Sequence, residues 1–239
     1  VPFYAAGVLG VVAAILSQIL LKEPERLEEP EQDLETAGQN SLSKILMPKF
    51  LIAFIVIFVA SFGLAAFESF FALFVDHKFA FTPTDIAIAI TGGAIIGAIC
   101  QVLLFDGLMK GLGEIKLVRI SLMLSAVLVM ALTVVSSYWM IMLVTFTVFI
   151  GFDLIRPAVT TYLSRIAGND QGFVGGMNSF FTSLANVFGP IVGGIMFDID
   201  INYPFYFGTV VIIAGLVIAM MWKDPAMKKL MNHQKETTI

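Results

Sequence analysis

Three ionisable side chains, Glu68, Asp153 and Arg156, lie deep within the apolar segments of this 239-residue sequence. A charge near the middle of a bilayer costs about 2.5 kcal/mol or more, so residues of this kind are candidates for function. Glu68 has no basic residue within a helical turn. A buried carboxyl group without a basic partner can act as a protonatable switch. The alternative is a structural ion pair, or a charge near the end of a span that reaches the interface.

Asp153 and Arg156 are three residues apart, so both would lie on one face of a helix. Pro157 follows, and it lacks the N–H group that would bond the carbonyl oxygen of Asp153. The helix is therefore weakened beside the acid. This position is either a functional hinge or a kink that neighbouring helices tolerate.

Small and polar residues recur at helical spacing around these charges and predict the wall of a cavity. They are Ser61, Ala65, Glu68 and Ala72, then Thr91, Ala94, Ala98 and Gln101, and then Ser179, Thr182, Asn186, Gly189 and Gly193. Close packing of helices through small residues is the alternative, and it is favoured for the pairs Gly93/Gly97 and Gly189/Gly193. Phe71 and Phe149 are one turn from Glu68 and Asp153 respectively. Aromatic rings beside a buried carboxylate would suit a lipophilic organic cation.

The composition places these residues in a membrane protein. Hydrophobic residues make up 58% of the sequence and charged residues 13%, and the mean hydropathy is +0.92. No basic stripe suggests a nucleic-acid partner. The single Cys100 has no partner for an internal disulfide, and His77 and His233 are too few and too isolated for a metal site.

Seven apolar stretches are long enough to cross a bilayer core of about 30 Å. They are 3–21, 49–75, 84–105, 117–136, 138–166, 171–197 and 204–222, with short connections at 76–83, 106–116, 167–170 and 198–203. The sequence thus predicts an all-α integral membrane protein. Its parts are a helix at 1–21 that is not a signal peptide, an acidic linker at 22–48, a six-helix bundle at 49–222 and a tail at 223–239.

The positive charges give the expected orientation. Twelve of the 14 Lys and Arg residues fall on the side of the linker and tail, whereas the opposite loops contain Lys78 alone. The positive-inside rule therefore predicts a cytoplasmic linker and C-terminus and an external N-terminus.

An internal repeat predicts the wider architecture. The first span opens with Pro2-Phe3-Tyr4 and the last with Pro204-Phe205-Tyr206, and each closes with a basic-acidic-proline sequence. Both copies run in the same direction, as do the two six-helix halves of a major facilitator transporter. On this interpretation residues 1–21 are the last helix of an N-terminal half and residues 49–222 are the whole C-terminal half. The alternative is chance similarity between two apolar helices.

Four motifs resemble the C-terminal half of NorA-type multidrug efflux pumps of Gram-positive bacteria. They are 61–68 (SFGLAAFE), 88–93 (IAITGG), 149–158 (FIGFDLIRPA) and 172–179 (GFVGGMNS). The resemblance implies a proton-coupled antiporter of the bacterial cell membrane that exports fluoroquinolones, dyes and quaternary ammonium compounds. Such a pump uses the proton-motive force and no cofactor. Its partners would be drugs, protons, the bilayer and a missing N-terminal six-helix half.

The same resemblance assigns roles to individual residues. Glu68 and Asp153 would be its proton-linked carboxylates and Arg156 its cavity arginine. Its pocket positions would fall on Phe71, Ile90, Phe149, Phe152, Ser183 and Asn186. Residues 106–113 are a degraded form of the family's cytoplasmic gating loop, and 189–194 (GPIVGG) repeat its Gly-Pro antiporter motif, which makes Pro190 a second candidate hinge.

Three other functions are weighed against efflux. A proton symporter or a uniporter would hold a neutral metabolite through Gln101, Thr182 and Asn186. An intramembrane enzyme is disfavoured because the spans contain no Ser/His, Asp/Asp or Glu/His pair at hydrolase spacing. The chain could also be a non-transporting half or a regulatory protein, because six helices form only one wall of a central cavity.

Overall fold

The computed structural model describes residues 2–20, 47–168 and 170–222, and every regular element in these ranges is an α-helix. The chain divides into two units, residues 1–40 and 41–239, which are described separately. Nearly all of the predicted linker and the whole predicted tail lie outside the described residues.

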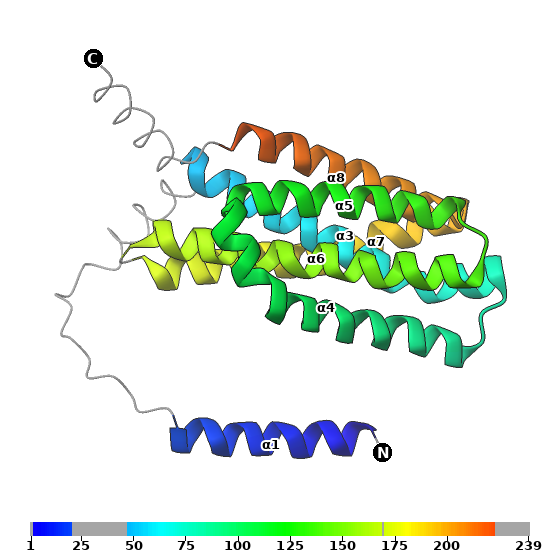
Figure 1. The fold of residues 1–239 in the computed structure, drawn as a ribbon, viewed down its shortest axis with the longest axis horizontal. Coiled ribbons are helices and arrows are strands. Elements are labelled where there is room, and N and C mark those ends of the chain that lie inside the picture. The colour runs from blue at the N-terminus through cyan, green and yellow to red at the C-terminus, as the bar shows by residue number, and fades with distance from the viewer. Residues whose placement is uncertain (1, 21–46, 169, 223–239) are drawn as a thin grey trace. The chain divides into compact units, whose positions relative to one another are not determined.

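The first unit contributes one helix, α1 (Pro2–Leu20), drawn in blue in Figure 1. It corresponds to the first predicted span. It has 19 residues, the same length as α8 (Tyr203–Met221), which carries the second Pro-Phe-Tyr sequence.

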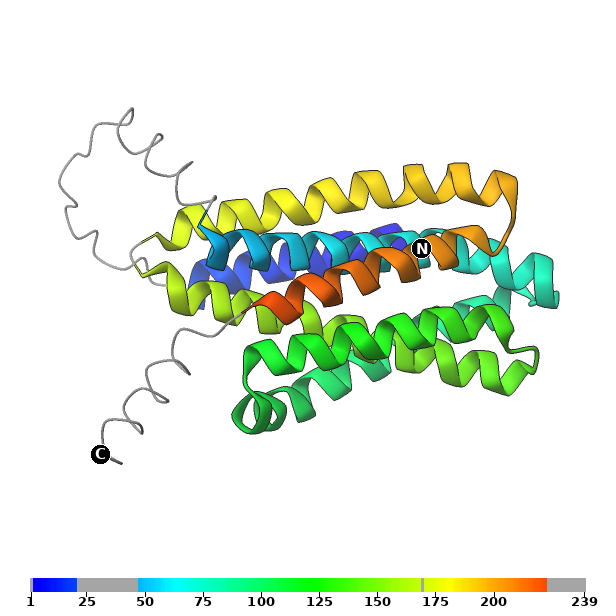
Figure 2. The ribbon, with the colours of Figure 1, turned by 90° about the horizontal axis from the view of Figure 1, so that it is seen from above.

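The second unit is a bundle of six helices that run alternately in opposite directions (Figures 1 and 2). They are α3 (Pro48–Phe79), α4 (Pro83–Leu112), α5 (Glu114–Val134), α6 (Tyr138–Ala167), α7 (Gln171–Ile199) and α8. Each is long and apolar enough to cross a membrane. The six spans predicted for this part of the chain, and the all-α class, are therefore confirmed.

Helices α3, α4, α6 and α7 extend beyond the predicted spans, α5 and α8 begin earlier and end one or two residues earlier, and the predicted connection at 106–116 is wrong. Helix α4 continues to Leu112 and α5 begins at Glu114, so only Gly113 separates them. Gly113 has φ +76°, in the region that glycine tolerates best. Asp106 and Lys110 are both exposed and four residues apart, a spacing that favours a continued helix over a loop.

Helix α3 lies at the centre of the bundle, between α7 and α8 in Figure 2, and also packs on α6. Phenylalanine rings fill these interfaces. The ring of Phe67 meets Phe149 of α6 edge-on at 6.0 Å and Phe205 of α8 at 6.2 Å. Edge-to-face contacts of this kind hold the helices in register.

Small residues bring α7 close to α3. A methyl group on Gly189 would lie 3.1 Å from the Cβ atom of Ala65, and one on Gly193 would overlap the ring of Phe70. Packing, the favoured interpretation of this glycine pair, is therefore what the structure shows.

At one end of the bundle, here called the Lys78 end, the ammonium group of Lys78 bonds to two other elements. Lys78 Nζ donates hydrogen bonds to the carbonyl oxygen of Thr133 at 2.6 Å and to Asn202 Oδ1 at 2.9 Å. The ammonium also lies 4.9 Å from the centre of the Phe74 ring. Lys78 thus connects α3, the end of α5 and the turn between α7 and α8.

Helix α4 starts at the same end with a capping box. The hydroxyl of Thr82 accepts a hydrogen bond from the backbone N–H of Asp85, and the Asp85 carboxylate accepts one from the N–H of Thr82. Tyr138, at the start of α6, donates its hydroxyl proton to Asp85 Oδ1 at 3.0 Å. The starts of α4 and α6 are therefore linked.

The opposite end, the Arg119 end, joins α5 to α8. Arg119 donates from Nε to the carbonyl oxygen of Ala219 at 2.8 Å and from Nη2 to that of Trp222 at 2.6 Å. The Ala219 carbonyl also accepts the backbone N–H of Trp222, and the Arg119 guanidinium adds a positively charged donor at this C-terminal end of α8. Trp222 packs edge-on against Tyr162 of α6, with 4.6 Å between ring centres.

Candidate functional site

A cavity of about 210 Å³ opens between α3, α6 and α7. Its lining residues are Ile57, Ala60, Ser61, Leu64, Ala65 and Glu68 of α3, Phe152 and Arg156 of α6, and Thr182 and Asn186 of α7. The α3 residues recur every three or four positions, as one face of a helix requires. The cavity combines an apolar wall with one acid, one base and neutral hydrogen-bonding groups.

Glu68 and Asp153 approach the cavity from different helices. Glu68 lines it directly from α3, whereas Asp153 is half-buried between α6 and α4 and is not among the lining residues. Glu68 is exposed in the described bundle, whereas Asp153 lies against the backbone of α4 at Gly97. A cation or a proton that bound either carboxylate would neutralise its negative charge.

Gly97 of α4 makes the room that Asp153 occupies. A Cβ atom at position 97 would overlap Asp153 Oδ2 and would lie 3.4 Å from the Cβ atom of Phe149. The carboxyl group therefore rests directly on the backbone of α4. The spacing of Gly93 and Gly97 predicted only helix packing, so the contact between Gly97 and Asp153 was not expected.

Arg156 lines the cavity one turn beyond Asp153. Within the residues that the structure describes, neither Arg156 nor either carboxylate forms an ion pair. The arrangement therefore differs from the structural ion pair that was the alternative explanation for these charges.

The hydroxyl of Thr182 is buried and lacks a hydrogen-bond partner among the described residues. Thr182 is 9% exposed and lines the cavity together with Asn186. An unsatisfied buried hydroxyl costs free energy, which a water molecule or a ligand in the cavity would offset.

The other predicted pocket residues lie elsewhere. Ser183 is exposed on α7, and Ile90 and Gln101 are half-buried on α4. Phe71 is fully buried and Phe149 is 4% exposed, and both contact Phe67 in the packed interior. Of the predicted aromatic residues, Phe152 alone lines this cavity.

Pro157 and Pro190 lie inside continuous helices, α6 and α7 respectively. Neither divides its helix in two. Their role as hinges stays a prediction.

Three lining residues, Ile57, Ala60 and Leu64, were not singled out from the sequence. They precede Glu68 by eleven, eight and four positions, so the helical period through Glu68 could have identified them. They were missed because an apolar side chain in an apolar span gives no signal of its own.

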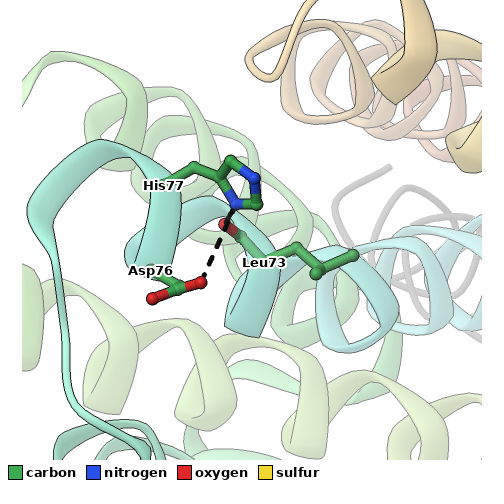
Figure 3. Close-up of polar contacts among 3 residues, drawn as sticks. All are labelled: Leu73, Asp76 and His77. Carbon is green, nitrogen blue, oxygen red and sulfur yellow. Dashed lines mark hydrogen bonds and ion pairs between the residues drawn. The ribbon is translucent and has the colours of Figure 1, made fainter.

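His77 precedes Lys78 on α3 and is not among the residues that line the cavity; Figure 3 shows its contacts with Leu73 and Asp76. With a proton on Nδ1, its ring donates to the carbonyl oxygen of Leu73 at 2.9 Å, and the same nitrogen lies 3.9 Å from Asp76 Oδ2. No group of three or more potential His, Cys, Asp or Glu metal ligands occurs in the part of the chain that the structure describes.

A sequence model of the Major Facilitator Superfamily matches residues 53–237, which include every helix that lines the cavity. The chain belongs to the Major Facilitator Superfamily. Members of this superfamily are multi-pass membrane transporters built from six-helix halves, and they are not enzymes. The resemblance seen in the four motifs is thereby confirmed at the level of the family.

Three relatives of this facilitator chain carry functional names. It is 60% identical over 225 residues to Multidrug resistance protein 1 of Bacillus subtilis (strain 168), covering 94% of this chain. It is 47% identical to Multidrug resistance protein 2 of the same strain, and the match covers 93% of this chain. It is 42% identical to Quinolone resistance protein NorA of Staphylococcus aureus (strain MRSA252), also over 93%. The chain spans 57% of the length of each relative.

Proposed function

We propose that this bundle is the coupling half of a proton-driven antiporter that exports lipophilic, often cationic drugs across the bacterial cell membrane. The proposed substrates are fluoroquinolones, dyes and quaternary ammonium compounds. The observation that carries the proposal is the Glu68 carboxylate, which lines a cavity between membrane-spanning helices and has no basic partner among the described residues. The names of the relatives support the substrate class.

A lipophilic cation fits the chemistry of the cavity. The carboxylate of Glu68 supplies negative charge at the cavity wall, Asp153 adds negative charge on the neighbouring helix α6, and the buried ring of Phe152 supplies apolar surface. Charge pairing and burial of apolar groups would act together on one ligand. Thr182 and Asn186 add hydrogen-bonding groups that can orient it.

Proton coupling follows from competition for the same carboxylates. When both are ionised, they bind the cation from the cytoplasm. Protons entering from outside then neutralise them and release the drug, and the protonated acids return to deliver the protons inside. Each charge that crosses 100 mV is worth about 2.3 kcal/mol, so two protons exchanged for one monovalent cation can drive uphill export.

We further propose that a second six-helix bundle, to which α1 belongs, completes the cavity. The fraction of each relative that this chain spans supports this arrangement. The distribution of Lys and Arg residues supports a cytoplasmic location for the Arg119 end.

The test is ethidium efflux in proteoliposomes that contain the protein expressed from its complete reading frame. We expect an imposed proton gradient to drive ethidium transport, and Glu68→Gln and Asp153→Asn each to abolish it. Asp76→Asn is the matched control, because Asp76 is an exposed acid on α3 outside the cavity. Gradient-driven efflux that persists in both cavity variants would disprove the mechanism. Proton uptake on adding a neutral sugar or amino acid would indicate a symporter instead.

A further inference from the structure

A second hollow, here called the α5–α8 groove, lies away from the Glu68 cavity and shares no residue with it. Its volume is about 390 Å³, and α5 and α8 run side by side along it (Figure 1). It is lined by Met123, Ala126, Val127 and Met130 of α5 and by Thr209, Ile213 and Leu216 of α8. The hydroxyl of Thr209 donates to the carbonyl oxygen of Phe205 at 2.8 Å, so it is already satisfied. The groove is therefore suited to hydrocarbon.

The groove faces outward from the bundle. Met123 and Val127 on α5 are 54% and 61% exposed, and Ile213 on α8 is 47% exposed. Because α5 and α8 are long and apolar enough to cross a membrane, these exposed apolar side chains suit contact with acyl chains. An unfilled hollow at this depth would forfeit dispersion contacts on one side of its lining. A hydrocarbon chain in the groove restores them.

A free positive charge lies at one end of the same helix face. Lys116 precedes Met123 by seven residues, so it lies on the same face of α5, about 10 Å along the axis. Lys116 is exposed and forms no ion pair with any residue that the structure describes. Arg119, by contrast, is already bound to the carbonyls that end α8. Lys116 is thus the ammonium that an anionic group above the groove would meet.

We propose that the α5–α8 groove binds one anionic phospholipid, with an acyl chain between Met123 and Met130 and the phosphate group at Lys116. The lipid comes from the membrane leaflet at the Arg119 end. Dispersion contacts in the groove hold the chain, and attraction to the ammonium selects the headgroup. The site is independent of drug and proton binding, because it shares no residue with the Glu68 cavity.

The test is native mass spectrometry of the purified protein titrated with phosphatidylglycerol or phosphatidylethanolamine of identical acyl chains. Val127→Trp fills the groove from α5, and Ile213→Trp fills it from α8. Leu143→Trp is the matched control, because Leu143 is 66% exposed on α6, outside the groove. We expect both groove variants to lose the tightly retained phosphatidylglycerol adduct and the control to keep it. Thermal melting of each variant identifies any that fails to fold.

The headgroup is tested separately. Lys116→Gln should weaken phosphatidylglycerol binding about fivefold and leave phosphatidylethanolamine binding unchanged. Lys110→Gln, at an exposed lysine in the last turn of α4, should change the binding of neither lipid. If Val127→Trp, Ile213→Trp and Leu143→Trp retain phosphatidylglycerol to the same extent, the proposal is overturned. So would a dimer that only the groove variants abolish, because the occupant would then be a second copy of the chain. Neither result bears on drug export, since no gradient or drug is present.

Discussion

Replacing Gly97 with alanine should weaken drug efflux by displacing the Asp153 carboxyl group. The new methyl group would overlap Asp153 Oδ2, and Phe149 closes the adjacent side. The carboxyl group must therefore rotate away, or α4 must move off α6. If χ1 of Asp153 must turn about 30° from its preferred value to move the carboxyl group away, the cost is about 0.5–1.5 kcal/mol. Because about 1.4 kcal/mol is a factor of ten, any step that needs the carboxyl group in place should weaken about 2- to 13-fold.

The assay measures the ethidium concentration that gives half-maximal gradient-driven efflux. Gly92→Ala is the matched control on the same helix, because its methyl group would lie 3.0 Å from the movable edge of the Phe146 ring and far from the carboxylate. We expect the half-maximal concentration to rise for Gly97→Ala and to stay near the parent value for Gly92→Ala.

A double-mutant cycle separates this cause from general misfolding. If Gly97 acts by positioning Asp153, adding Gly97→Ala to Asp153→Asn should perturb ethidium binding less than it perturbs the parent protein. Equal effects of the alanine in both backgrounds would refute the reasoning. Equal effects of Gly97→Ala and Gly92→Ala would refute it too.

Three further predictions concern the Lys78 end. Lys78→Met removes two hydrogen bonds that a half-buried ammonium donates, so it should destabilise the bundle by about 1–3 kcal/mol in thermal melts. Lys110→Met, at an exposed lysine, is the control, and equal melting temperatures for the two variants would contradict the prediction. Thr82→Ala should cost about 0.5–2 kcal/mol and speed hydrogen exchange in the first turn of α4 alone. Hydrogen bonds from Asn202 hold the pKa of the Asp200 carboxyl below its ordinary value. These bonds therefore stabilise the turn fully at a pH above the ordinary pKa, and this stabilisation is lost as the pH falls through the lowered pKa. Acid-induced exchange at the turn, corrected for the intrinsic rate, should therefore vanish in Asp200→Asn.

The spans of the bundle could be predicted because bilayer thickness sets a minimum apolar length, which each helix exceeds. The ends of the helices could not, because beyond the apolar core other interactions decide them. At the end of α3, Lys78 bonds to Thr133 and Asn202, which are distant in sequence. Gly113 alone turns the chain where a longer loop was expected.

Four predicted polar residues, Glu68, Arg156, Thr182 and Asn186, do meet at one cavity, whereas Asp153, Gln101 and Ser183 are not among its lining residues. The aromatic part of the candidate site was predicted less well. Phe71 is only one turn from Glu68, yet it is covered by neighbouring helices and fully buried. Sequence spacing places a residue on a helix face, but the neighbours of that face are determined by tertiary packing.

The packing of α4 has a mechanical consequence. Among the described helices of the bundle, α4 packs mainly on α6 and only slightly on α5, whereas Arg119 bonds α5 to the end of α8. In a bundle stiffened in this way, α4 is the element whose displacement breaks the fewest contacts. Its principal support is the interface where Asp153 rests on Gly97. A change in the charge on that carboxyl group would therefore act at the packing interface of the helix that is most easily displaced.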